Sequence, residues 1–383
     1  MFRVYYPPLP NQICNICNKR SNLISGHIGV CVSCIRDENA RVSAFLSKAH
    51  TKARENFDQP AKPPKNENGV QCVLCANCCQ IGENQVGYCG LRINQDGRLF
   101  HLAGTPERGL LHWYRDPLPT NCVAMWVCAG QKRFGQHNLA VFYGSCVNNC
   151  LYCQNWHYRD MLPNNQEIDK IHETGKHASS HSLQKRLISA RDLADKANKR
   201  TYCVCFFGGD PASQMPHALG TASYLIDCGV TICWETSGNV NKRLLDRAVD
   251  YSLSSGGVIK FDLKAFDETL HIALTGVSNK RSLENFARTA SKFSENSNTP
   301  FVIASTLLVP GYVDADEVGR IARFIASFHP EIPYSLLSFG PHFYLSDLPT
   351  TSHRHAMAAE KAAKDAGLRN VRVGNRHLLS NSY

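Results

Sequence analysis

Short apolar runs rich in β-branched and aromatic residues alternate with longer amphipathic segments from about residue 136 to the end of the chain. Six runs have the length and composition of buried strands, at 139–145, 201–209, 229–238, 257–266, 300–311 and 334–341. Because helical patterns separate them, consecutive strands are expected to be parallel. The pattern therefore predicts an α/β fold with an open or partial TIM-like (β/α)6 barrel.

Two further segments have a clear helical pattern. In 182–200 the apolar residues fall at helical spacing, at Leu183, Leu187, Ala190, Ala194 and Ala197. The segment 351–367 is rich in alanine and ends at Gly367, a residue type that commonly stops helices. Reactive groups of parallel barrels gather at the carboxyl ends of the strands, so the residues after each run are the first candidates for chemistry.

The 18 cysteines are grouped along the chain, and none follows Cys233. A segment rich in Pro, Lys and Asn, at 59–69, separates the first two groups and has the composition of a linker. We therefore expect two small cysteine-rich, metal-binding modules ahead of one large domain. The expected division is a first module at 1–58, a linker at 59–70, a second module at 71–135 and the barrel domain at 136–383.

The composition is that of an ordinary soluble protein, because 43% of the 383 residues are hydrophobic and no apolar run approaches the roughly 18 residues of a membrane span. The start MFRVYYPPLP lacks the apolar core of a secretory signal, so we expect a cytoplasmic protein without membrane association. In that reducing compartment, so many cysteines indicate metal ligands rather than disulfides. The formal charge of +10 would fall to about +5 with three thiolate metal sites filled, and therefore gives little support for nucleic acid binding.

The first cysteine group has the spacing C-x2-C-x13-C-x2-C, formed by Cys14, Cys17, Cys31 and Cys34. Two such pairs suit a tetrahedral metal ion, and a short module with little core of its own depends on its metal to fold. The spacing favours a structural zinc ribbon. A rubredoxin-like iron site is the alternative.

Three cysteines, Cys146, Cys150 and Cys153, follow the first predicted strand directly. A structural zinc or an electron-transfer cluster normally takes four protein ligands, whereas three ligands leave one metal position open to a substrate or cosubstrate. The alternative is a zinc site completed by a distant residue such as His157.

The spacing C-x3-C-x-aromatic-C, with Tyr152 at the aromatic position, resembles the signature of the radical SAM superfamily. The resemblance implies a [4Fe-4S] cluster on Cys146, Cys150 and Cys153, with its fourth iron bound by the amino and carboxylate groups of S-adenosylmethionine. It further implies one-electron cleavage of the sulfonium to methionine and a 5′-deoxyadenosyl radical, which abstracts hydrogen from a substrate.

Three stretches at the ends of later strands resemble those of the pyruvate formate-lyase activating enzymes. FFGGDP resembles Gly-Gly-Glu-Pro, WETSGN resembles Asp/Glu-Thr-Asn-Gly, and FDLK resembles the Asp-Leu-Lys motif. The resemblance implies cosubstrate contacts from Gly208, Gly209, Asp210, Glu235, Thr236, Asp262 and Lys264, in addition to Tyr152. The sequence departs from the pattern at Asp210 and Ser237. By spacing alone, Asp262 and Lys264 would also suit a structural ion pair on one strand face.

Within the superfamily, residues 70 to 375 are most similar to the group that includes the AmmeMemoRadiSam enzymes. That group carries an upstream cysteine segment, and the matching positions here are Cys72, Cys75, Cys79 and Cys89, with Cys78 left over. The resemblance implies a metal site on these four thiolates. Both a second iron-sulfur cluster and zinc remain open for it.

The remaining cysteines look structural. Cys203 and Cys205 alternate on a predicted strand, Cys228 and Cys233 flank another, and all four have the pattern of small buried hydrophobic residues. Cys122 and Cys128 are expected to pack within a loop, although they could add ligands near the second module. A stretch with three histidines, His172, His177 and His181, is expected to be a solvated loop.

These observations predict a radical SAM oxidoreductase, and the likeness to activating enzymes favours a protein or peptide substrate. A flavodoxin- or ferredoxin-like protein is then the expected low-potential electron donor. Radical modification of RNA or of a small metabolite is an alternative with the same chemistry. A non-catalytic iron-sulfur electron carrier or docking protein is the alternative from a different class.

Overall fold

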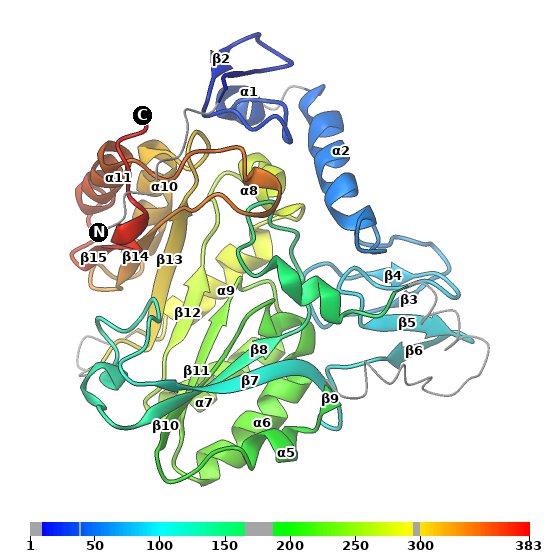
Figure 1. Cartoon of the computed structure of the whole chain (residues 1–383). Helices are drawn as coiled ribbons and strands as arrows, with labels where there is room; N and C mark the ends of the chain where they lie inside the picture. The colour runs from blue at the N-terminus through cyan, green and yellow to red at the C-terminus, as the bar shows by residue number, and fades with distance from the viewer. Residues whose placement is uncertain (1–9, 38–39, 165–186, 294–298) are drawn as a thin grey trace.

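A nine-stranded sheet forms the centre of the computed structural model, which describes residues 10–37, 40–164, 187–293 and 299–383 (Figure 1). Its strand order is β15-β14-β13-β12-β11-β10-β8-β7-β9. The strands from β8 to β15 in this order pair in parallel with their neighbours. They are β8 (His137–Tyr143), β10 (Thr201–Phe207), β11 (Thr231–Thr236), β12 (Ile259–Asp262), β13 (Val302–Leu308), β14 (Tyr334–Ser338) and β15 (Val371–Gly374).

The structure confirms the predicted α/β class and all six predicted strands of the partial barrel. Three strands of the same sheet were not predicted. β15 has only four residues, and the antiparallel strands β7 (Gly109–Pro117) and β9 (Leu187–Ile188) form the other edge. The exposed end of β7 is polar, so its sequence lacks the apolar character of a buried parallel strand. β7 belongs to the stretch 71–135 in sequence and to the central sheet in space.

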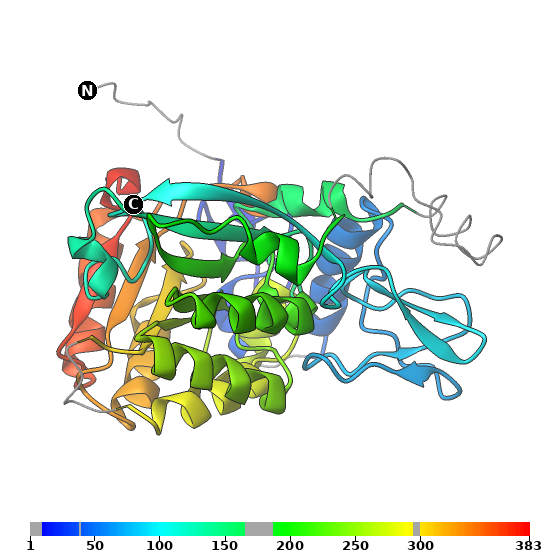
Figure 2. The same ribbon diagram turned by 90° about the horizontal axis from the view of Figure 1, so that it is seen from below.

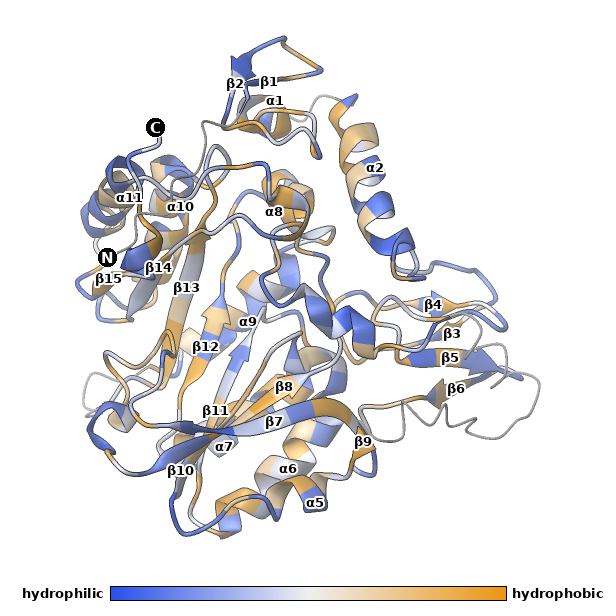
Figure 3. Ribbon diagram, in the orientation of Figure 1, coloured by the Kyte–Doolittle hydropathy of each residue, from blue (hydrophilic) through white to orange (hydrophobic). Residues whose placement is uncertain are grey.

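Helices cover the outer face of the sheet (Figure 2). They are α6 (Met215–Asp227), α7 (Lys242–Ser255), α8 (Glu268–Thr275), α9 (Lys280–Ala290), α10 (Ala315–Ala326) and α11 (His353–Asp365). Those that pack on the strands bury an apolar stripe, as α10 does with Val318, Ile321 and Ile325, whereas α8 lies beyond the strand ends (Figure 1). In Figure 3, strands such as β8 and β12 are coloured largely as hydrophobic, as expected of strands buried under helices. No helix among the described residues is long and apolar enough to cross a membrane.

The helix predicted over 182–200 is wrong for most of its described part. Leu187 and Ile188 form β9, which pairs with Gly109 and Leu110 of β7, and the helix α5 covers only Ala190–Ala194. Ser189 ends the strand and caps α5, because its hydroxyl accepts a hydrogen bond from Asp192 N at 3.1 Å. Pairing with a distant strand therefore overrides the local helical spacing. Residues 182–186 lie outside the described part.

The predicted C-terminal helix is confirmed as α11. Ser352 caps its start by accepting a hydrogen bond from His355 N at 3.1 Å. Two residues after its end, Gly367 has φ of +104°, a backbone conformation that glycine adopts without steric cost. Short 3-10 turns complete the secondary structure at Ala129–Lys132, Trp156–Met161, Pro211–Gln214, Phe343–Leu345 and Arg376–Leu378.

The N-terminal part packs against the barrel. It consists of β1 (Gln12–Ile13), β2 (Arg20–Ser21), α1 (Val32–Arg36) and α2 (Val42–Glu55). Arg36 makes a two-pronged ion pair with Asp314, at 2.9 and 3.0 Å, and reaches Glu317 at 3.1 Å. Apolar residues such as Ile24 and Ile35 belong to the same buried cluster as the barrel core. The module is therefore docked on the barrel rather than tethered to it.

Two small hairpins follow the linker. β3 (Val70–Gln71) pairs with β4 (Gln80–Ile81), and β5 (Arg92–Gln95) pairs with β6 (Arg98–His101). They extend sideways from the barrel next to α2 (Figure 1). Tyr88 and Arg54 join the hairpins to α2, because the Arg54 guanidinium lies 3.6 Å from the centre of the Tyr88 ring.

Candidate active site

The loop after β8 holds Cys146, Cys150 and Cys153 against the end of α8. Asn149 N donates to Thr275 O at 2.7 Å, and Leu151 N donates to Leu274 O at 3.0 Å. The carbonyls at the end of a helix lack partners within it, so the loop supplies them. The backbone of the loop is thereby fixed between the first strand and α8.

Buried side chains from three other segments brace the same loop. Arg159 donates to Asn149 Oδ1 at 2.7 Å and to Gln59 Oε1 at 2.7 Å. Asn149 Nδ2 lies 2.9 Å from Nδ1 of His50 on α2. Arg159 is 3% exposed and His50 is 5% exposed, so water competes little with these contacts.

A pocket of about 190 Å³ opens above this loop and brings together the residues that the sequence proposed for the cosubstrate. Its lining includes Cys146, Cys150, Cys153, Tyr152, Gly208, Gly209, Asp210, Glu235, Thr236, Asp262 and Lys264. These residues come from the ends of β8, β10, β11 and β12, which are neighbours in the sheet. The arrangement has the form expected of a site at the carboxyl ends of parallel strands.

The thiols of this pocket are buried except where they face it. Burial raises the pKa of the Cys150 thiol to about 12, and the positive charge of Lys264 acts in the opposite direction. Asn148 N donates to Cys146 Sγ at 3.4 Å. A metal that binds here must displace the thiol protons, and three thiol ligands leave a coordination position for a further ligand.

The backbone at Gly208 and Gly209 can be formed only by glycine. Both residues have positive φ, +66° and +37°. A Cβ on Gly208 would lie 2.2 Å from the Phe142 ring, and one on Gly209 would lie 2.2 Å from Ser145 O. The turn therefore lies so close to Phe142 and Ser145 that no side chain has room there.

Asp210 ties the ends of β10 and β11 together. Its carboxylate accepts hydrogen bonds from Ala212 N at 2.9 Å, Thr236 Oγ1 at 2.8 Å and Ser237 N at 3.0 Å, and from the Ser237 hydroxyl. Burial raises the pKa of Asp210, while these hydrogen bonds act to lower it. The shorter acid therefore has a full set of partners within the protein, and Ser237, the other departure from the family pattern, supplies two of them.

Asp262 and Lys264 form an ion pair at the end of β12, in which Lys264 Nζ donates to Asp262. β12 ends at Asp262, so Lys264 lies just beyond the strand. Burial acts to lower the pKa of Lys264, but the Asp262 carboxylate outweighs it and holds that pKa well above its usual range. The lysine is therefore positively charged in the pocket, and its ammonium lies 5.9 Å from the centre of the Tyr152 ring.

Several pocket residues were not proposed from the sequence. They are Asn148, Gln154, Asn155, Tyr158, Phe207, Ser237, Leu307, Leu337 and Asn375. Leu307 and Leu337 are paired in register on β13 and β14, so a strand alignment could have found them. His157 does not line the pocket, and its Nδ1 lies 3.8 Å from a carboxylate oxygen of Asp160 on the exposed side of the loop.

The four N-terminal cysteines converge as the spacing predicted. Their sulfur atoms all lie within 4.8 Å of one another, with Cys14 3.8 Å from Cys34 and Cys17 3.7 Å from Cys31. Burial acts to raise the pKa of the Cys14 thiol, but backbone hydrogen bonds outweigh it and lower that pKa to about 6. Four thiols at this spacing can hold one tetrahedral metal ion.

The second cysteine group touches the three-cysteine loop. Ser145 Oγ donates to Cys89 O at 2.8 Å, and Asn77 Nδ2 donates to Val147 O at 2.8 Å. Three of its four proposed ligands, Cys72, Cys75 and Cys79, are buried. In the described part of the chain, these four sulfurs do not form a set as tight as the N-terminal one.

The structure confirms the buried positions predicted for Cys203 and Cys205 and the loop position of Cys122 and Cys128, and it corrects the rest of the interpretation of the remaining cysteines. Cys228 is exposed and is not a core residue. Cys203, Cys205 and Cys233 are largely buried, but they line a second cavity together with Cys122 and Cys128. Cys122 and Cys128 therefore lie in the barrel and not near the second module. The three histidines at 172, 177 and 181 lie outside the described residues.

Known proteins similar to this chain share one kind of domain. Residues 140–325 match the family model of the radical SAM superfamily. A Methanocaldococcus jannaschii protein, named provisionally as a glycyl-radical enzyme activating enzyme, is 30% identical over 46% of this chain and 60% of its own. The pyruvate formate-lyase 1-activating enzyme of Escherichia coli is 28% identical over 48% of this chain and 66% of its own.

The match thus spans less than two thirds of the length of either relative. An uncharacterised protein of Methanocaldococcus jannaschii is 24% identical over a longer stretch, 83% of this chain and 85% of its own. The family match covers the cysteine loop and the strands β10 to β13, whose ends form the pocket. Residues 140–325 are thus similar to the radical SAM superfamily, and this part of the chain resembles proteins named as activating enzymes of glycyl-radical enzymes.

Proposed function

We propose that this protein reductively cleaves S-adenosylmethionine and uses the resulting radical to abstract hydrogen from a protein or peptide substrate. The observation that carries the proposal is the convergence of three loop thiols with the ends of β10, β11 and β12 in one pocket. When bound, a [4Fe-4S] cluster and S-adenosylmethionine supply a one-electron cleavage that yields a 5′-deoxyadenosyl radical. Cys146, Cys150 and Cys153 would hold the cluster.

The other pocket residues have separate tasks in this proposal. Gly208 and Gly209 line the pocket, so the backbone of this turn would contact the amino group of the cosubstrate. Lys264 would neutralise its carboxylate. Asp210 would hold the ends of β10 and β11 at a fixed spacing, so that Glu235 and Thr236 face the pocket. Tyr152 would pack beside the lysine.

The protein substrate is proposed from the relatives, which are named as activating enzymes of other proteins. A flavodoxin- or ferredoxin-like donor would supply the electron. The cytoplasm, where thiols stay reduced, is the compartment that suits these cysteines. For the division of the chain we propose 1–58, 59–70, 71–135 and 136–383, with β7 joining the third part to the sheet.

We further propose zinc for the four N-terminal cysteines. For Cys72, Cys75, Cys79 and Cys89 we propose a second iron-sulfur cluster. The position of these four cysteines supports this proposal, because their segment contacts the three-cysteine loop through Ser145 and Asn77. A cluster there could relay electrons or contact substrate.

The proposal is tested by anaerobic reconstitution with iron and sulfide, followed by incubation with S-adenosylmethionine and a low-potential reductant. We expect 5′-deoxyadenosine and methionine in equal amounts, measured by chromatography. A protein with a confirmed cluster but no 5′-deoxyadenosine would favour the electron-carrier function instead.

Replacement of Lys264 by methionine is expected to weaken binding of S-adenosylmethionine without loss of iron. A charge-assisted hydrogen bond contributes about 1.5 to 3 kcal/mol, so the dissociation constant should rise roughly ten-fold or more. Calorimetry on the reconstituted protein measures this dissociation constant. The double variant Asp262→Asn/Lys264→Met removes both charges of the pair; affinity that returns to the wild-type value in this variant would make the pair purely structural. Lys242→Met, at an exposed surface ion pair, is the control.

A further inference from the structure

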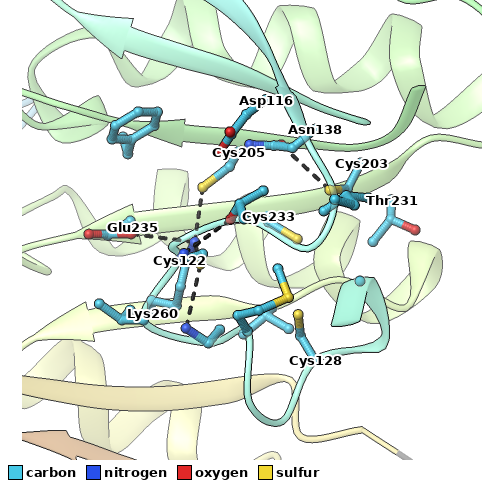
Figure 4. Close-up of a pocket in the computed structure, with 18 of the residues that line it drawn as sticks. Asp116, Cys122, Cys128, Asn138, Cys203, Cys205, Thr231, Cys233, Glu235 and Lys260 are labelled. Carbon is cyan, nitrogen blue, oxygen red and sulfur yellow. Dashed lines mark hydrogen bonds and ion pairs between the residues drawn. The ribbon is translucent and has the colours of Figure 1, made fainter. Parts of the chain in front are cut away.

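A second cavity, of about 320 Å³, lies inside the barrel and is lined by five cysteine thiols (Figure 4). We call it the thiol cavity; its cysteines are Cys122, Cys128, Cys203, Cys205 and Cys233. It shares Asn155, Phe207 and Glu235 with the pocket at the three-cysteine loop. The two sites are therefore neighbours with a common wall.

The sheet register brings three of the thiols together. Cys203 and Cys205 alternate on β10, so both side chains point to the same face of the sheet. Cys205 is paired in register with Cys233 on β11. Cys203 Sγ also donates to Asn138 Oδ1, at 3.5 Å, on the adjacent strand β8. The inner face of two neighbouring strands thus carries sulfur where a barrel usually carries branched apolar side chains.

The other two thiols come from the loop between β7 and β8, which crosses to the far side of the sheet. Trp126 Nε1 donates to Ser335 Oγ on β14 at 3.0 Å, and Ser335 Oγ donates to Val123 O at 3.0 Å. These contacts fix the loop over the barrel interior. Cys122 and Cys128 therefore face the strand cysteines from a defined position (Figure 4).

A buried lysine points at the sulfur atoms. Lys260 is 2% exposed, and its ammonium donates to Cys205 Sγ at 2.9 Å and to Cys122 Sγ at 3.1 Å. It also lies 3.4 Å from the Glu235 carboxylate, its neighbour in register on β11. A buried ammonium is costly unless negative charge compensates it, and neutral thiols are weak acceptors. Glu235 supplies one negative charge, and thiolates at the two closer sulfur contacts would supply more.

We propose that the thiol cavity binds an iron-sulfur cluster through four of its five cysteine thiolates, Cys122 and Cys128 among them. This inference concerns residues outside the radical SAM motif and does not depend on the proposed cleavage of S-adenosylmethionine. Thiolates are the ligands of iron-sulfur clusters, and Lys260 would offset part of the negative charge of the bound cluster.

Size and geometry favour a cluster over one metal ion. The four N-terminal sulfurs lie within 4.8 Å of one another, whereas the five sulfurs of the thiol cavity are farther apart. A cavity of 320 Å³ also exceeds the space of a single ion by far. Thiols are weak hydrogen-bond partners, so the five thiols themselves are better suited to a metal than to an organic ligand.

The test uses the full chain in a background that lacks the other proposed iron-sulfur ligands. In the variant Cys75→Ala/Cys146→Ala/Cys150→Ala/Cys153→Ala, we expect about two to four iron atoms and a matching amount of acid-labile sulfide per chain after anaerobic reconstitution. Addition of Cys122→Ser and Cys128→Ser should remove them together with the electron paramagnetic resonance signal of the reduced protein. Addition of Cys228→Ser, at an exposed cysteine outside the cavity, should change nothing.

The same loop variants in the otherwise wild-type chain give a second measurement should the background variant fold poorly. Cys122→Ser/Cys128→Ser should lose about two to four iron and equal sulfide relative to Cys228→Ser. Unchanged sulfide in this comparison would overturn the proposal, as would loss of zinc in place of iron. Sulfide readings do not depend on formation of 5′-deoxyadenosine, so a failure here is distinct from a failure of the proposed radical chemistry.

Discussion

Replacement of Cys150 by alanine should abolish formation of 5′-deoxyadenosine by the reconstituted protein. Cys150 is buried in the centre of the three-cysteine loop and lines the pocket, so alanine would leave the site with two thiols. Residues that merely orient metal ligands contribute roughly 10- to 100-fold, so loss of a ligand should lower the rate by more than about 100-fold. Chromatographic quantification of 5′-deoxyadenosine measures the effect, and iron per chain should fall in parallel.

The matched control is Cys228→Ala, because Cys228 is exposed and lies outside both pockets. It should retain the wild-type rate and iron content. Formation of 5′-deoxyadenosine at the wild-type rate by Cys150→Ala would refute the proposal that this loop holds the cluster. A folded variant is recognised by an unchanged thermal transition, since Leu151 and Asn149 keep their backbone bonds to α8.

Replacement of Cys14 by alanine should remove zinc and unfold the N-terminal module. Zinc binding contributes roughly 10 to 16 kcal/mol in small modules of this type, and that energy is folding energy because the four-thiol site forms only in the folded module. Cys14 is fully buried at the centre of the four sulfurs. Elemental analysis should show about one zinc fewer per chain, and limited proteolysis should cut the N-terminal module while the barrel persists.

The variant Cys75→Ala, compared in the same measurement, should lose about four iron and equal sulfide and keep its zinc. Cys78→Ala is the control, because Cys78 is the spare cysteine of that group and its thiol donates to Cys75 O. Loss of zinc from Cys75→Ala would make the second group structural. Loss of iron without sulfide from Cys14→Ala would instead assign a rubredoxin-like iron to the first group.

Asp262 and Lys264 illustrate how two interpretations of a motif can both describe the same residues. The spacing suggested either a structural ion pair or a cosubstrate contact, and the structure contains the ion pair within the pocket. Asp210 is similar, because its hydrogen bonds to Ser237 and Thr236 join two strands. No sequence pattern predicts those partners, since they lie 26 and 27 residues away along the chain.

The thiol cavity also arises from contacts between segments that are distant along the chain. Alternation predicted that Cys203 and Cys205 share one face of a strand, but it could not tell that this face borders a cavity. The register of β10 against β11 brings Cys233 beside Cys205, and a loop fixed to β14 adds Cys122 and Cys128. The position of the loop depends on contacts more than 200 residues apart.

Local sequence patterns were enough to predict the features whose causes are local. Ligand spacing within a few residues identified the three-cysteine loop and the N-terminal metal site, and apolar runs identified six parallel strands, because turn geometry and strand burial depend on neighbouring residues. Only the tertiary structure decided the edge strands, the short α5, the partners of Asp210 and the thiol cavity. Each of these arises from pairing or packing between distant segments, whose free energy depends on the whole fold and leaves no period in the local sequence.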